Sequence, residues 1–190
     1  MESGELRFRE APFDLVALVE DVTALLAPTA SEKNLRICNE FEVPFPAWFS
    51  GDSGRIRQCL INLVGNAVKF TDSGRVLVSV RSDGLVGINI TVKDTGPGIP
   101  EAVRDRIFLA FEQVETGANR STDGTGLGLA ITRQLAELMG GEVRVSDEPG
   151  YGAVFTLKLP LSPVPVPSQN AEPNCSRLRR TPLRRIQSKR

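Results

Sequence analysis

The sequence contains no histidine among its 190 residues, so no imidazole is available as a metal ligand, a general base or a phosphoryl acceptor. Its three cysteines, Cys38, Cys59 and Cys175, lie at unrelated spacings, which indicates neither a disulfide framework nor a metal centre and fits a reducing compartment. No apolar run of about eighteen residues is present, and the N-terminus does not resemble a signal peptide. We therefore expect a cytoplasmic domain, with a membrane-anchored parent protein as an open alternative.

The net charge is zero, but it is unevenly distributed along the chain. Residues 171–190 hold seven Arg or Lys side chains and one acid, Glu172, so the preceding residues carry a charge of about minus six by subtraction. An acidic body of this kind predicts no nucleic-acid partner. With 41% hydrophobic residues, the chain is long enough for one buried domain and an additional tail.

The hydrophobic pattern predicts one domain over residues 13–161, with alternating helical and strand-like segments. Residues 1–12 are interpreted as the exit from an upstream helix, and the Pro-rich and basic residues 162–190 as a disordered tail. Asp14 and either Asp52 or Ser53 are expected to cap the first two helices. The predicted helices cover residues 15–33, 52–71, 100–107 and 127–139. The predicted strands cover residues 35–41, 47–49, 76–80, 88–94, 142–145 and 154–159.

A glycine-rich turn, Asp94-Thr-Gly-Pro-Gly-Ile99, directly follows one of the alternating strands. The strand period leaves Asp94 at its end, where the carboxylate can accept a hydrogen bond from a ligand. Gly96 and Gly98 allow a ligand to approach the main chain closely. Taken alone, the turn is more simply explained as a tight loop with a solvated Asp.

Asn62, Asn66 and Lys69 form a narrow polar stripe within about 60° on the second predicted helix. The simple alternative is that this stripe faces solvent. However, asparagine is a poor helix former, whereas its amide oxygen is a suitable ligand for Mg²⁺ beside phosphate groups.

The run Gly124-Thr-Gly-Leu-Gly-Leu129 leads directly into the third long helix. Three glycines permit close backbone approach, and the helix start presents unpaired N–H groups that favour phosphate oxygens. The run is weak as a signal by itself, since no Lys-Ser/Thr follows it as in a P-loop and no strand precedes it as in a dinucleotide fold.

Five stretches taken in order resemble the catalytic and ATP-binding domain of sensor histidine kinases, a member of the GHKL superfamily with the Bergerat fold. They are Asn62-Leu-Val-Gly-Asn-Ala-Val-Lys-Phe-Thr71, Asp94-Thr-Gly-Pro-Gly-Ile99, Phe108-Leu-Ala-Phe-Glu-Gln113, Gly124-Thr-Gly-Leu-Gly-Leu129 and Gly150-Tyr-Gly-Ala-Val-Phe155. The resemblance implies an α/β two-layer sandwich in which a mixed sheet backs three helices. ATP would lie between helices under a lid formed by residues 109–123.

The resemblance also implies roles for individual residues. Asp94 would accept the adenine amino group, in a base pocket shaped by Gly96, Gly98 and Ile99. Asn66 would ligate Mg²⁺, with Asn62 beside it. The remaining nucleotide-binding residues would be Lys69, Phe70, the lid residue Arg120, and the glycine-rich Thr125, Gly126, Leu127, Gly128 and Leu129. Asn62, Lys69 and Arg120 are also expected to take part in catalysis.

The chain departs from the pattern of the family at three positions. Ala110 stands where proline is usual between Phe108 and Phe111, two rings expected to anchor the lid by packing. Asp123 replaces a usual glycine and adds negative charge near the phosphates. Ala153 replaces a usual serine or threonine and removes a hydroxyl on the adenine side.

Asn62 also bears on the reaction. Gyrase, Hsp90 and MutL, which share the glycine boxes, carry a glutamate four residues before the metal asparagine, where it activates water. In this chain that position is Asn62, and an amide cannot take a proton from water. The resemblance therefore implies a histidine kinase that transfers the γ-phosphoryl group of ATP. Because the chain has no histidine, the acceptor must lie on a separate dimerisation and phosphoacceptor domain, with a response-regulator receiver domain downstream. We expect a monomeric fragment of a homodimeric parent. The alternatives are a nucleotide-binding module without turnover and a slow ATPase.

Overall fold

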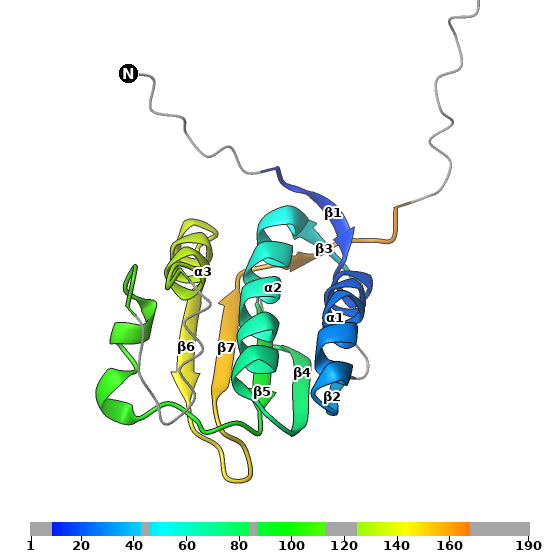
Figure 1. Cartoon of the computed structure of the whole chain (residues 1–190). Helices are drawn as coiled ribbons and strands as arrows, with labels where there is room; N and C mark the ends of the chain where they lie inside the picture. Colours follow the sequence, from blue (N-terminus) through cyan, green and yellow to red (C-terminus); the bar gives the residue numbers. More distant parts are fainter. Residues whose placement is uncertain (1–8, 43–45, 84–86, 113–124, 168–190) are drawn as a thin grey trace, which may run out of the picture.

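A mixed five-stranded sheet forms one layer of the fold, and the helices cover one of its faces (Figure 1). The computed structural model describes residues 9–42, 46–83, 87–112 and 125–167. The strands, in their spatial order, are β2 Leu35–Phe41, β4 Gly74–Ser82, β5 Ile88–Asp94, β7 Val154–Leu159 and β6 Glu142–Ser146. β2 and β4 are parallel, and the other neighbours are antiparallel. The predicted fold class is confirmed.

Three α-helices, α1 Leu15–Glu32, α2 Ser53–Phe70 and α3 Gly128–Leu138, form the second layer. The predicted caps are confirmed: an oxygen of Asp14 accepts from the Ala17 N–H at 3.0 Å, and an oxygen of Asp52 accepts from the Arg55 N–H at 3.1 Å. α2 lies between the other two helices and contacts both (Figure 1). Its apolar positions therefore face α1, α3 and the sheet. In the described part of the chain, every helix is too short or too polar to cross a bilayer.

The alternation along β5 decides where Asp94 lies. Ile88, Ile90 and Val92 are buried on the helix side of the sheet, and Asp94 is the next residue of the same series. The carboxylate is thus brought to the end of the sheet on the side that the helices cover.

A small second sheet extends the folded unit beyond its predicted limits. It joins β1 Ala11–Asp14, β3 Trp48–Gly51 and β8 Ser162–Pro163. The prediction of disorder directly after Leu161 is therefore wrong for the first two residues of that segment, and Ala11 and Pro12 belong to a strand rather than to an upstream helix. The physical reason is packing, because Phe13 and Leu161 are both buried and lie next to Gly51. Residues 168–190 lie outside the described ranges.

The short helix expected over residues 100–107 is instead two 3₁₀ turns, η1 Glu101–Val103 and η2 Arg106–Phe108. Val103, Arg104 and Leu109 each donate their N–H to the carbonyl three residues earlier. A segment this short gains little from the α-helical pattern, so the tighter turn is favoured.

Candidate functional site

The carboxylate of Asp94 is buried and held by two backbone groups. One oxygen, Oδ1, accepts from the N–H of Gly96 at 2.9 Å and from the N–H of Ala153 at 3.2 Å. Oδ2 has no hydrogen-bond partner among the described residues. Burial raises the pKa of Asp94, and the two backbone hydrogen bonds oppose this effect. The site therefore offers a fixed acceptor oxygen in a water-poor setting.

Two glycine turns interlock beside Asp94. Gly152 donates its N–H to the Asp94 carbonyl at 2.6 Å, and a Cβ at Gly152 would lie 2.2 Å from the Gly96 carbonyl oxygen. Gly98 has a left-handed φ of 76° and lies against the carbonyl of Gly152. Ile99 follows, partly buried against the core. Glycine is needed here because the two backbones touch.

Asn62 links α2 to the start of α3. Its Nδ2 donates to the Gly128 carbonyl at 3.1 Å and to the Thr132 hydroxyl at 3.3 Å. The alternative in which the polar stripe of α2 is only a solvent face is therefore wrong for Asn62. Asn66, one turn later, is partly buried, and its amide has no hydrogen-bond partner within the described ranges. Asn62 is therefore held beside the glycine-rich start of α3.

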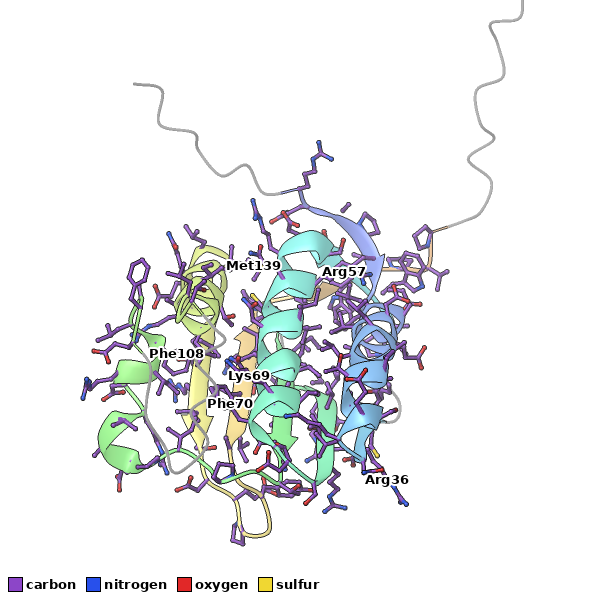
Figure 2. The ribbon with its side chains drawn as sticks, in the orientation of Figure 1. Arg36, Arg57, Lys69, Phe70, Phe108 and Met139 are labelled. Atoms are coloured by element: carbon purple, nitrogen blue, oxygen red, sulfur yellow. The ribbon has the colours of Figure 1, made fainter. Side chains whose placement is uncertain are left out.

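Lys69 and Phe70 end α2, on the side of the helix toward α3 (Figure 2). Phe70 is 52% exposed. The Lys69 ammonium lies 4.9 Å from the centre of the Phe70 ring. A large exposed ring beside a cation is available to a ligand.

The glycine-rich start of α3 is joined to the segment that ends at Glu112. Gly126 has a left-handed φ of 69°, and its carbonyl accepts from the Phe111 N–H at 3.1 Å. Leu127 is the N-cap residue and makes no capping hydrogen bond with its apolar side chain. Thr125 is exposed, while Leu129 packs against the core. The N–H groups of the first turn thus receive no cap from Leu127.

The two phenylalanines expected to anchor the lid behave differently. Phe108 is buried and meets Phe155 edge to face, with ring centres 6.3 Å apart. Phe111 is 75% exposed, so the prediction that it packs is wrong. The reason is that η2 ends at Phe108 and Phe111 adopts a left-handed φ of 66°, which breaks the helical spacing between the rings. The backbone N–H of Phe111 nevertheless bonds to the Gly126 carbonyl.

Four further residues bear on the site: Arg120 and Asp123, which the sequence singles out, and Thr71 and Lys33, which it does not. Arg120 and Asp123 lie outside the described residues. Sequence reasoning gave no role to the Thr71 hydroxyl, which is buried beside Gly96 without a hydrogen-bond partner in the described part of the chain. It also missed Lys33, whose ammonium reaches the end of α2. A lysine at the end of an amphipathic helix ordinarily indicates only a solvated side chain.

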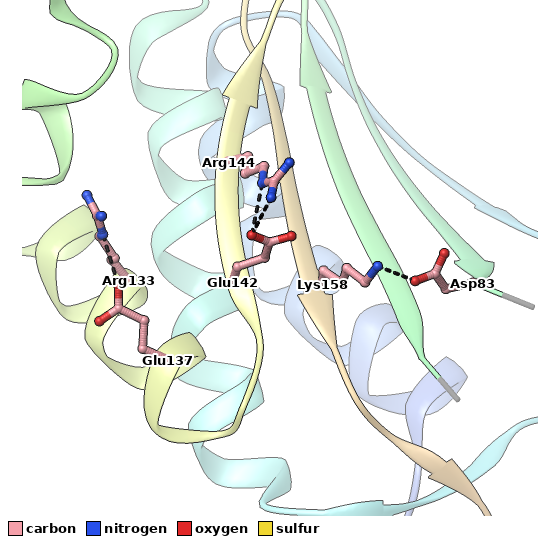
Figure 3. Close-up of polar contacts among 6 residues, drawn as sticks. All are labelled: Asp83, Arg133, Glu137, Glu142, Arg144 and Lys158. Atoms are coloured by element: carbon pink, nitrogen blue, oxygen red, sulfur yellow. Dashed lines mark hydrogen bonds and ion pairs between the residues drawn. The ribbon is translucent and has the colours of Figure 1, made fainter. Parts of the chain in front are cut away.

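A separate hollow lies between η1, η2, α3 and β6. It is lined largely by charged side chains that already pair, including Arg133 with Glu137 and Arg144 with Glu142 (Figure 3). Neither Asp94 nor Asn66 lines it. It is therefore distinct from the cluster around the strand end.

The fold and the clustered residues define an α/β sandwich of the nucleotide-binding ATPase and kinase class. The chain belongs to the family described as "Histidine kinase-, DNA gyrase B-, and HSP90-like ATPase", whose sequence profile matches residues 51–163.

Two curated relatives are named as sensory proteins, and one of them as a sensor histidine kinase. The chain is 38% identical over 167 residues to the sensory/regulatory protein RpfC of Xanthomonas campestris pv. campestris, covering 85% of this chain and 23% of RpfC. It is 40% identical over 161 residues to the sensor histidine kinase RcsC of Escherichia coli, covering 85% of this chain and 17% of RcsC. The chain thus spans less than a quarter of the length of these relatives.

Solved structures of histidine kinases share this fold. Full-length ShkA, crystallised in complex with AMPPNP, superposes with a TM-score of 0.75 at 40% identity, over 86% of this chain and 33% of ShkA. The histidine kinase ThkA in complex with the response regulator protein TrrA gives a TM-score of 0.69 at 26% identity, over 85% of this chain and 44% of that one. The expected family and fold are confirmed.

Proposed function

We propose that this chain is the ATP-binding catalytic domain of a two-component sensor histidine kinase. It binds ATP with Mg²⁺ and transfers the γ-phosphoryl group to a histidine on a separate phosphoacceptor domain. The observation that carries the proposal is the buried Asp94 carboxylate, which lies at the sheet end and offers one oxygen to a ligand. Membership of the kinase and ATPase family supports it.

The base end of the site fits adenine. Asp94 Oδ2 accepts a hydrogen bond from the exocyclic amino group, and the unpartnered Thr71 hydroxyl lies on the same side, beside Gly96. A guanine base presents an oxygen at the equivalent position, which would face the carboxylate unfavourably. We therefore expect discrimination between amino and oxo purines.

The phosphate end combines an amide, a cation and a helix start. Asn66 supplies an oxygen for Mg²⁺, and the ion, when bound, neutralises charge on the phosphate oxygens. The first N–H groups of α3 favour anionic oxygens, because the positive end of the helix dipole lies there. Lys69 adds charge, and Arg120 is proposed to do so from the segment outside the described residues.

The reaction follows from what Asn62 cannot do. An amide has no proton-accepting capacity at neutral pH, and the nitrogen of Asn62 already donates to Gly128 and Thr132. Hydrolysis by this domain alone lacks a general base, so phosphoryl transfer to an external nucleophile is favoured. Because the sequence has no histidine, the acceptor lies on another domain of a parent kinase, which we propose to be homodimeric. We also propose a response-regulator receiver domain as the next acceptor.

A transfer assay tests the proposal. The chain is incubated with γ-labelled ATP, Mg²⁺ and a purified histidine-containing phosphoacceptor domain, in parallel with Asn66→Ala. Asn39→Ala is a matched control, since it removes an amide on β2 that donates to the Thr23 hydroxyl of α1. Label transfer that persists in the control and is lost in Asn66→Ala supports the kinase.

The same assay distinguishes the alternatives. Binding of ATP without transfer to any acceptor indicates a nucleotide-binding module. Release of inorganic phosphate without an acceptor, lost in Asn66→Ala, indicates a slow ATPase. A wild-type chain that binds no Mg-ATP would contradict every form of the proposal.

A further inference from the structure

Lys33, the C-cap residue of α1, extends its side chain to the end of α2. Its Nζ donates to the carbonyl oxygens of Val68 at 3.0 Å and of Lys69 at 2.6 Å, and it lies 3.4 Å from the carbonyl of Thr71. These residues are 35 to 38 positions away in sequence. The side chain is partly buried, so the contacts are not those of a freely solvated lysine.

These contacts account for the terminal carbonyls of α2. A helix leaves its last four carbonyl oxygens without partners inside the helix. At the end of α2, the Ala67 carbonyl accepts from the Thr71 N–H at 3.2 Å, and the next two are bonded by Lys33. The fourth, that of Phe70, lies beside Gly96. A single ammonium therefore satisfies half of the terminal carbonyls and places a positive charge at the negative end of the helix dipole.

The turn that Lys33 holds carries three groups of the proposed nucleotide site. Lys69 and Phe70 present their side chains beside the site, and Thr71 lies buried against the glycine turn that follows Asp94. Immediately afterwards the chain leaves the helix, because Thr71 is extended with ψ of 123°. Without a cap, a helix end of this kind frays, and these groups would lose their fixed positions.

We propose that Lys33 is a positioning residue for nucleotide binding, which orders the last turn of α2 so that Lys69 and Phe70 meet the nucleotide. It touches no ligand itself. The inference rests on the proposed function and adds α1 to the elements that build the site. The expected signature is a loss of affinity for Mg-ATP that exceeds what a general loss of stability produces.

The experiment compares Lys33→Met, which keeps the aliphatic stem, with Lys33→Arg, which keeps the cation. Lys158→Met is the matched control. It removes the same charge, and Lys158 on β7 pairs with Asp83, the residue that follows β4, away from α2 (Figure 3). Affinity for Mg-ATP is measured by calorimetry at a temperature where every variant is folded, and thermal unfolding is recorded separately. Transfer to the phosphoacceptor domain gives KM and kcat.

We expect Lys33→Met to weaken Mg-ATP binding roughly tenfold, which is typical of losing charge-assisted hydrogen bonds. KM for ATP should rise by a similar factor, while kcat at saturating ATP stays within about twofold, because bound nucleotide orders the turn again. Lys33→Arg should recover most of the affinity, and Lys158→Met should leave it unchanged.

An Mg-ATP affinity for Lys33→Met equal to wild type, or lowered no more than in Lys158→Met, overturns the inference. If Lys33→Met does not fold, Lys33→Gln is measured in its place, and the same two outcomes decide. A wild-type chain that fails to bind Mg-ATP contradicts the proposed function instead, so the two failures are distinguishable.

Discussion

The base end and the phosphate end of the site are built in different ways. At the base end, Asp94 continues a buried strand, and backbone groups of Gly96 and Ala153 hold its carboxylate. At the phosphate end, single polar contacts join separate segments: Phe111 bonds to Gly126, and Asn62 bonds to Gly128. The base end is thus fixed by the sheet itself, whereas the phosphate end depends on how α2, α3 and the residues before Glu112 are held together.

The largest expected effect is on stability, and it distinguishes Phe108 from Phe111, the two rings in the segment joined to the start of α3. Phe108→Ala removes a buried ring that packs on Phe155, so unfolding free energy should fall by about 3–4 kcal/mol. Phe111→Ala truncates a ring that is 75% exposed and should cost less than about 0.5 kcal/mol. Urea unfolding of both variants measures the difference. Equal losses would show that Phe111 packs in solution.

The second effect tests how rigid the base end is. Gly152→Ala places a Cβ 2.2 Å from the Gly96 carbonyl oxygen, and we expect a loss of about 2–3 kcal/mol in stability. Because the clash displaces the turn beside Asp94, affinity for ATP should also fall at least about tenfold.

Gly141→Ala is the matched control for this change. Its Cβ would lie 2.1 Å from the Lys158 carbonyl oxygen, at the start of β6 and away from Asp94. A similar loss of stability with ATP affinity unchanged is expected, with both properties measured on the folded protein. A Gly152→Ala variant that binds ATP normally would mean that the two turns move apart easily.

The base end could be predicted from the sequence because it depends on local pattern. Alternation along residues 88–94 fixes the side of the sheet on which Asp94 lies, and glycines mark the turns. What could not be predicted was the partner of its carboxylate, since the N–H of Ala153 comes from the residue that precedes β7, 59 positions later in the chain. Register between distant strands is set by tertiary packing rather than by local preference.

The phosphate end was less accessible to sequence reasoning. The family resemblance predicts that Phe108 and Phe111 both pack, but only Phe108 is buried. η2 stops at Phe108 and Phe111 adopts a left-handed φ of 66°, so the two rings do not lie on one face of a regular helix. Helix boundaries carry the weakest sequence signal, because capping contacts such as those of Lys33 come from another helix.

A smaller difference in stability is expected between variants of the two asparagines of α2, Asn62 and Asn66. Asn62→Ala leaves the link to α3 unmade and should cost about 1–2 kcal/mol in unfolding free energy. Asn66→Ala removes an amide with no hydrogen-bond partner in the described ranges, so stability should change by less than about 0.5 kcal/mol while Mg²⁺-dependent ATP affinity falls. Unfolding and titration with ATP, with and without Mg²⁺, separate the two. Equal stability losses would indicate that Asn66 makes a structural bond.

The smallest expected effect is the pH dependence that Asp94 contributes at the base end. Burial raises the pKa of this carboxyl group above the usual 3.8, so the folded state favours the neutral form. The stability that Asp94 contributes is therefore fully present below the ordinary pKa and is lost as pH rises through the raised one. Asp94→Asn keeps an acceptor for Gly96 and Ala153 but does not titrate. Its stability relative to wild type should thus be greatest near neutral pH, by less than about 1 kcal/mol, and decrease as the solution is acidified.

Urea unfolding of both proteins from about pH 8 to about pH 4 measures this difference, because titration of the other carboxylates cancels. The affinity for nucleotide should depend on pH in the opposite direction. Only the ionised carboxylate is purely an acceptor, so wild-type affinity for ATP should fall on acidification, and Asp94→Asn should bind weakly at every pH. Parallel stability curves would mean that Asp94 is solvated in the folded protein, and the base end would then be no more rigid than the phosphate end.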